Sequence, residues 1–133
     1  MRALLPPGWP RPKGYANGIS ARGRMIFTAG VVGWDAQERF ASPDLAGQFR
    51  QALANILAIL AEDHAGPGHI VRMTCYVTSV ETYRQSVREI GAAWRELIGR
   101  HYPAMAVVQV SGLVEDEARL ELEATAVIAE GSP

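Results

Sequence analysis

One segment with two chemically opposite faces limits what this chain can fold into. Residues 119–127 read RLELEATAV, in which polar and apolar side chains alternate strictly from Arg119 to Ala126. Successive side chains of a β-strand point to opposite faces, so Glu121 and Glu123 share one face and the leucines share the other. One face therefore predicts a hydrophobic core behind it, and the other predicts a polar partner opposite the two carboxylates.

The rest of the chain predicts an α+β fold of the order β-β-α-β-α-β-β. In chain order, the expected elements are strands at 19–21 and 25–29, a loop over 30–42, a helix capped by Ser42 and ending before Gly66, a strand at 69–78, a helix from Thr78 to about 98, and strands at 103–110 and 119–127. We expect one domain over residues 1–133, with residues 1–12 as an extended lead-in. Two helices can cover only one face of the resulting mixed sheet.

The closing strands indicate which face the helices cover. We assign Ala106, Val108 and Val110 to the helix side, together with the leucines of 119–127. The opposite face would then carry Met105, Val107, Gln109, Glu121 and Glu123. A face that mixes apolar groups with charge predicts a homo-oligomer with polar pockets between subunits. An exposed face of a monomer is the alternative.

Composition narrows the classes of function. Thirteen Lys and Arg residues balance fourteen Asp and Glu residues without a basic run, which argues against a nucleic-acid partner. No apolar segment approaches the ~20 residues of a membrane span. The single cysteine, Cys75, lies in an apolar run and predicts a buried thiol in a reducing cytoplasm. The three histidines lack the spacing of metal ligands, so no metal is expected.

Several stretches together resemble the RidA family, also called YjgF, of enamine and imine deaminases. In sequence order they are Gly14-Tyr15, Phe27-Thr28-Ala29-Gly30, Ile70-Val71-Arg72-Met73-Thr74, Tyr102-Pro103-Ala104 and the run from Leu120 to Val127. The resemblance covers roughly residues 13–129. It implies a chorismate mutase-like fold, a homotrimer with clefts between subunits, and hydrolysis of 2-enamino or 2-imino acids without a cofactor.

The same resemblance assigns roles to individual residues. It implies that Glu121 orients the attacking water, that Tyr15 forms a wall of the pocket, and that Arg72 stands where the family usually has lysine. Trp34 is a further candidate for lining the cleft. His101 directly precedes Tyr102-Pro103, the stretch expected beside the cleft. Read without the family, Glu121 could instead be an interface carboxylate paired with Arg72 or Arg119.

Other positions depart from the family pattern. The arginine that grips the substrate carboxylate corresponds to Met105, and Ala29, Val107 and Val87 replace small polar residues. A thioether cannot supply the charge and the bidentate hydrogen bonds of a guanidinium. The chain therefore resembles the arginine-lacking branches, and an atypical imine or enamine substrate is expected. The alternative is a protein on the same scaffold that binds a small ligand without catalysis.

Overall fold

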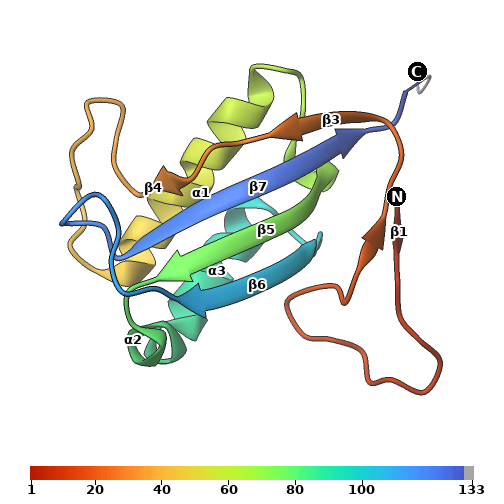
Figure 1. Cartoon of the computed structure of the whole chain (residues 1–133), viewed down its shortest axis with the longest axis horizontal. Helices are drawn as coiled ribbons and strands as arrows, with labels where there is room; N and C mark the ends of the chain where they lie inside the picture. Colours follow the sequence, from red (N-terminus) through yellow and green to blue (C-terminus); the bar gives the residue numbers. More distant parts are fainter. Residues whose placement is uncertain (131–133) are drawn as a thin grey trace.

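A mixed β-sheet forms one layer of the molecule, and helices cover a single face of it (Figure 1). The computed structural model describes residues 1–130. The strands of the main sheet are β3 (Arg24–Phe27), β4 (Val31–Val32), β5 (Ile70–Val77), β6 (Ala104–Gln109) and β7 (Leu120–Ile128). They lie in the order β3-β7-β5-β6, with β4 also pairing with β7; β5 and β6 are parallel, and the other pairs are antiparallel.

The helices come from two segments of the chain. They are α1 (Leu45–Ala61), the short 3₁₀ turn η1 (Pro67–His69), α2 (Val80–Gln85) and α3 (Val87–Leu97). The second predicted helix is interrupted at Ser86, whose hydroxyl donates to the Thr82 carbonyl at 2.8 Å. The predicted cap of α1 was wrong by two residues. Asp44 is the N-cap and accepts from the Gly47 N–H, while Ser42 donates to the Asp44 carboxylate.

The predicted α+β, chorismate mutase-like fold is confirmed, although its first strands differ from the prediction. β2 (Ile19–Ser20) pairs with β1 (Arg2–Ala3) of the expected lead-in and not with β3. Figure 1 shows this N-terminal segment projecting beside the sheet. The expected loop over 30–42 contains β4, a strand too short for its periodicity to be recognised. No helix within residues 1–130 is long and apolar enough to cross a membrane.

The hydrophobic core lies between the sheet and helices α1 and α3. Phe49, Leu53 and Ile56 of α1 are fully buried, as are Leu120 and Leu122 of β7. The two faces of residues 119–127 are as predicted: the leucines face the core, and the glutamates face away from it.

The buried polar side chain of Gln48 ties this core to the segment that enters β7. Its amide nitrogen donates to the carbonyls of Ser42 and Glu117, at 3.1 and 2.9 Å. Its amide oxygen accepts from the Arg119 N–H at 2.7 Å. Buried polar groups persist when their hydrogen bonds are made, and these three bonds fix where β7 begins.

The predicted orientation of the strand at 103–110 was wrong. In the parallel pairing of β5 with β6, Met105 lies opposite Met73 and Val107 lies opposite Cys75. Met73 and Cys75 are fully buried under the helices, so Met105 and Val107 also face the helix side. Ala106 and Val108 instead face outward. The one polar residue of this strand, Gln109, belongs to the same set as Met105 and Val107 and so favoured the wrong face. It lies at the end of β6, where its side-chain oxygen accepts from the Val80 N–H of α2 at 2.8 Å.

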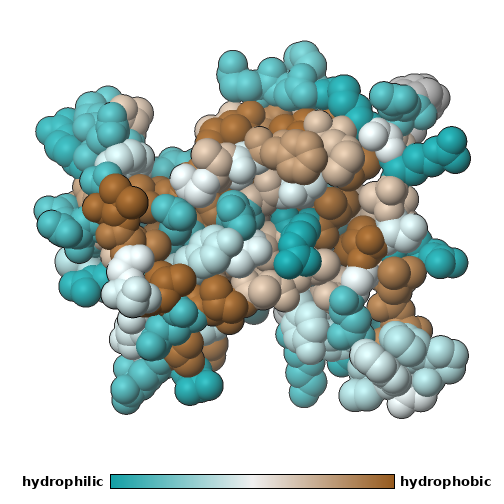
Figure 2. Space-filling model, viewed as in Figure 1, coloured by the Kyte–Doolittle hydropathy of each residue, from teal (hydrophilic) through white to brown (hydrophobic). Residues whose placement is uncertain are grey.

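We call the other side of the sheet the open face, because no helix covers it within the described residues (Figure 1). Three apolar side chains on it are exposed: Met25 by 56%, Phe27 by 66% and Val108 by 41%. Register pairs place Glu121 beside Tyr76, and Glu123 beside Thr74, on the same face. Figure 2 shows the resulting surface, on which brown apolar groups and teal polar groups intermingle.

Candidate functional site

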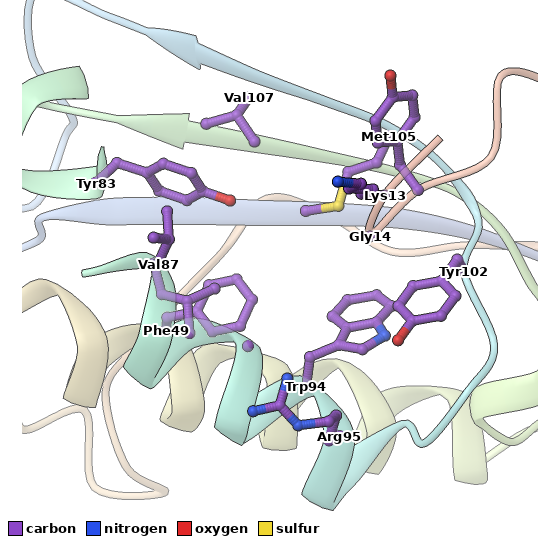
Figure 3. Close-up of a pocket in the computed structure, with 13 residues that line it drawn as sticks. Lys13, Gly14, Phe49, Tyr83, Val87, Trp94, Arg95, Tyr102, Met105 and Val107 are labelled. Atoms are coloured by element: carbon purple, nitrogen blue, oxygen red, sulfur yellow. The ribbon is translucent and has the colours of Figure 1, made fainter. Parts of the chain in front are cut away.

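A pocket of about 420 Å³ opens on the helix side of the sheet, between α3 and the edge strand β6. It is lined by residues of five segments: Lys13, Gly14, Tyr15, Phe49, Tyr83, Val87, Ile90, Gly91, Trp94, Arg95, Tyr102, Met105 and Val107. Figure 3 shows Met105 and Val107 on the sheet side of this space, with Phe49, Trp94 and Arg95 across from them. We call this space the α3–β6 pocket. Its volume lies within the usual range of small-molecule sites.

Contacts among the lining residues and with neighbouring backbone hold the walls of the α3–β6 pocket in place. Trp94 stacks on Tyr102, with ring centroids 6.3 Å apart, and its indole N–H donates to the His101 carbonyl. Ala16 forms an isolated β-bridge with Ala104, and its backbone N–H donates to the Pro103 carbonyl at 2.9 Å. This last contact anchors the segment that presents Tyr15 at the pocket.

The polar groups of the pocket are few and lie on an apolar background. Burial raises the pKa of the Tyr83 phenol, which belongs to α2. Lys13 and Arg95 contribute two cationic side chains, and within residues 1–130 neither forms an ion pair. The space can therefore hold an apolar group and also offers positive charge at its margin.

Glu121 lies on the opposite face of the sheet from this pocket. A Cβ atom added at Gly30 would come within 2.5 Å of its Oε2, so the carboxylate rests directly against the Gly30 backbone. Within residues 1–130 the carboxylate has no hydrogen-bond donor and no ion pair, and it remains partly exposed. The alternative interpretation, an ion pair with Arg72 or Arg119 of the same chain, is not observed. Glu121 is thus free to accept a hydrogen bond from a bound molecule.

The loop that carries Ala29 is fastened to the strand that carries Glu121. Thr28 donates its backbone N–H to the Ala124 carbonyl at 2.9 Å, and its hydroxyl accepts from the Ala124 N–H at 3.0 Å. These bonds set Ala29 and Gly30 beside Glu121. Small residues at both positions leave the carboxylate accessible from the open face.

Arg72 and Glu123 belong to a neighbouring hollow on the open face. This hollow, about 240 Å³ in volume, is lined by Phe27, Thr28, Arg72, Thr74, Glu123, Ala124 and Thr125. Glu123 accepts a hydrogen bond from the Tyr76 hydroxyl at 2.6 Å, and this bond raises the pKa of the Tyr76 phenol. Glu123 is therefore occupied by a partner, whereas Glu121 is not.

Trp34 and His101 line neither the α3–β6 pocket nor the hollow that contains Arg72 and Glu123. Trp34 packs against Phe40, with ring centroids 5.8 Å apart, and lines a shallow hollow with Gly30 and Asn55. Asn55 donates to the Trp34 carbonyl at 2.7 Å. The His101 Nε2 lies 2.6 Å from the Ile70 carbonyl oxygen, so this imidazole bonds to the backbone of β5.

The predicted site residues therefore fall on two faces of one sheet. Tyr15, Met105 and Val107 line the α3–β6 pocket, while the open face carries Glu121 and Arg72. Sequence reasoning missed Lys13, Arg95 and the other two tyrosines of the pocket, Tyr83 and Tyr102. For Arg95 the available signal was the helical spacing of Val87, Gly91 and Arg95, which places a glycine and an arginine on one stripe.

Residues 1–130 offer no evidence of a metal site or a reactive thiol. No cluster of three histidine, cysteine or carboxylate side chains that could hold a metal ion occurs among them. Burial of Cys75 raises the pKa of its thiol to about 12, so the group stays protonated and packs as a small apolar side chain.

Comparison with known proteins gives a consistent result. A sequence model of the family described as Endoribonuclease L-PSP matches residues 10–128. The chain is 28% identical over 116 residues to the 2-iminobutanoate/2-iminopropanoate deaminase of Salmonella typhimurium, covering 85% of this chain and 86% of that protein. It is 30% identical over 119 residues to a RutC family protein of Pyrococcus abyssi, covering 88% and 89%.

Solved structures agree with these sequence matches. A conserved Rid family protein of Yersinia pestis, YyfB, superposes with a TM-score of 0.82 at 27% identity, covering 96% of this chain and 98% of that one. Escherichia coli TdcF with bound serine gives a TM-score of 0.71 at 27% identity, covering 97% and 100%.

Proposed function

Since the chain belongs to the Endoribonuclease L-PSP family, the family of the RidA and YjgF proteins, we propose that it deaminates a reactive imine or enamine by hydrolysis. The observation that carries this proposal is Glu121, a carboxylate that has no partner among residues 1–130 and lies against the Gly30 backbone. The name of its Salmonella relative supplies the reaction class.

The proposed chemistry uses water and one carboxylate. Water adds to the imine carbon while Glu121 accepts one of its protons, which gives a tetrahedral carbinolamine. The amino group then takes up a proton, the C–N bond breaks, and ammonia leaves as the carbonyl forms. Imine and water thus become carbonyl product and ammonia, with no oxidant and no cofactor required.

The site as proposed needs more than one chain. Glu121 and Met105 lie on opposite faces of the same sheet, so one subunit cannot bring the water-handling carboxylate to the α3–β6 pocket. A second copy packed against the open face could supply the missing half. The exposed Met25, Phe27 and Val108 on that face favour such packing. We propose a homotrimer in which each cleft takes Glu121 from one subunit and the pocket from its neighbour.

The pocket also supports an atypical substrate. Met105 and Val107 make its sheet side apolar, which disfavours a short 2-imino acid held mainly through its carboxylate. We propose a cytoplasmic enzyme, in keeping with its single buried thiol, that acts on an imine or enamine with a larger apolar group.

A second candidate is a binding protein without catalysis. The apolar pocket favours it, and so does the related TdcF, whose solved structure contains bound serine. RNA cleavage, which the family description names, is not proposed, because the chain has a net charge of −1 and no basic run.

Ammonia release tests these alternatives. The substrates are freshly generated 2-iminopropanoate and the imine of a larger amino acid such as phenylalanine, with wild type, Glu121→Gln and the matched control Glu123→Gln. Wild type and Glu123→Gln should exceed the spontaneous rate, and Glu121→Gln should lose about 10²–10⁴-fold. If ammonia release in the presence of all three proteins stays at the spontaneous rate, and the proteins still bind the substrates tightly, the chain is instead a binding protein. Size-exclusion chromatography with light scattering measures the assembly, and a monomer would overturn the two-chain site.

A further inference from the structure

The α3–β6 pocket contains two cations that the family resemblance did not predict. Arg95 comes from α3 and Lys13 from the segment before β2, and both line the space that Met105 and Val107 make apolar. Within residues 1–130 neither side chain pairs with a carboxylate, whereas Arg24 and Arg50 both do. Two unpaired cations beside an apolar cavity suit a ligand with one negative end and one apolar end.

Arg95 owes its position to Gly91, four residues earlier on the same helix. Long side chains in a helix lie over the preceding turn, so Arg95 covers residue 91. A Cβ atom at Gly91 would come 3.2 Å from the Arg95 Nη1, so the guanidinium lies close over the glycine. A glycine inside a helix costs about 0.5–1 kcal/mol relative to alanine. Here it keeps the pocket open and lets the guanidinium lie against the helix.

Lys13 reaches the pocket from a different part of the chain. The Ala16–Ala104 bridge holds its segment against the start of β6, and Gly14, at φ +81°, turns the chain between Lys13 and Tyr15. Figure 3 shows Lys13 near Met105 on the sheet side and Arg95 on the helix side, with the aromatic rings of Trp94 and Phe49 also on that side. The two charges thus enter from opposite walls.

From this arrangement we infer that the α3–β6 pocket binds an organic carboxylate with an aromatic or branched apolar body. Arg95 holds the carboxylate from the helix side, Lys13 attracts it from the opposite wall, and the body packs on Trp94, Phe49 and Met105. The charge lost at the Met105 position is thereby supplied from α3 and from the N-terminal segment. This inference rests on the proposed function only for the identity of the reacting group, because the binding itself requires no catalysis.

Calorimetric titration of the full-length protein tests the inference with three probes. They are 3-phenylpropanoate, its uncharged amide 3-phenylpropanamide, and pyruvate, which has the charge without the apolar body. The variants are Arg95→Gln, Lys13→Gln and Arg88→Gln. Arg88 is an exposed residue of α3 that does not line the pocket, and so provides the matched control.

Wild type and Arg88→Gln should bind 3-phenylpropanoate at least about tenfold more tightly than either the amide or pyruvate. Arg95→Gln should weaken binding of the acid about 10- to 100-fold while leaving the weak binding of the amide unchanged, and Lys13→Gln should have a smaller effect in the same direction. Equal affinities for acid and amide, or an Arg95→Gln variant that binds like wild type, would overturn the inference.

A further variant separates this inference from the proposed reaction. Glu121→Gln should bind 3-phenylpropanoate at least as tightly as wild type does, because Glu121 is not assigned to the carboxylate and the variant only removes a negative charge from the cleft. If wild type releases ammonia no faster than the spontaneous reaction while its Arg95-dependent binding is intact, the deaminase alone is refuted. Ammonia release that Arg95→Gln leaves unchanged, with no discrimination between acid and amide, would refute the carboxylate site alone.

Discussion

Two inactive variants should restore each other's activity if the site is shared between subunits. The first variant, Glu121→Ala, removes the carboxylate and leaves the α3–β6 pocket intact. The second, Gly91→Trp, fills the pocket and leaves Glu121 intact. At Gly91 the nearest atom to an added Cβ is the flexible end of Arg95, at 3.2 Å, so a large side chain can enter the pocket without displacing backbone. Each variant alone should be nearly inactive.

The expected recovery follows from the two-face geometry. In a random one-to-one mixture, a cleft works when its pocket comes from a Glu121→Ala subunit and its glutamate from a Gly91→Trp subunit. Each condition holds half of the time, so about one quarter of the clefts should work in any closed assembly of this kind. The same reasoning gives about one half for wild type mixed with Glu121→Ala. A site complete within one chain would give almost no recovery in the first mixture.

Co-expression of the two variants with different affinity tags provides the assay. Hybrid assemblies are isolated over both affinity columns in sequence. This step removes the pure oligomers and raises the expected fraction of working clefts in a trimer from about one quarter to about one third. Ammonia release is measured per subunit. Ala92→Trp, an exposed neighbour on α3, replaces Gly91→Trp in the matched control and should be fully active alone. Hybrids no more active than the sum of the separate variants would refute the shared site.

Four further outcomes test other parts of the structure. Met105→Arg should raise turnover of 2-iminopropanoate at least about tenfold, because it adds a charged donor to the apolar side of the pocket; an unchanged rate would contradict this. Leu122→Ala, at a fully buried position, should lower the free energy of unfolding in urea by about 2–5 kcal/mol. Asp44→Ala should cost about 1 kcal/mol at neutral pH. Hydrogen bonds from Ser42 and Gly47 lower the pKa of Asp44, so its contribution is present at neutral pH and is lost as the pH falls below about 4. The Cys75 thiol, with a pKa of about 12, should resist alkylation by iodoacetamide at pH 8 in native protein and react in urea.

Alternation along the chain predicted most of the fold. Residues 119–126 carry polar and apolar side chains in strict turn, so the core face of β7 could be assigned correctly. Strand β6 carries apolar residues on both faces, and only its pairing with β5 decides that Met105 points toward the helices. Segments of two residues, such as β4, form through tertiary pairing and leave no periodic signal.

The face assigned to Met105 and Val107 was wrong, and the roles of the individual site residues stay predictions. The resemblance identified Glu121 and Met105 without stating which face each occupies in this chain, and the error in β6 placed them together. Lys13 and Arg95 were missed because each lies in a segment whose local pattern is ordinary. Only the position of α3 beside β6, together with the Ala16–Ala104 bridge, brings them into one pocket. Distances across a fold are the information that local sequence does not contain.

The three hydrogen bonds of Gln48 also make the connection between β6 and β7 suitable for protein engineering. They hold Glu117 and Arg119 at one end of this connection, and the Val110 N–H bonds to the Val77 carbonyl at the other. Val114, between these anchors, is 94% exposed. A peptide tag or a fluorescent domain inserted at Val114 would lengthen only the free tip, since both ends are fixed independently of it. The chain could in this way carry a reporter without a change in the register that positions Glu121.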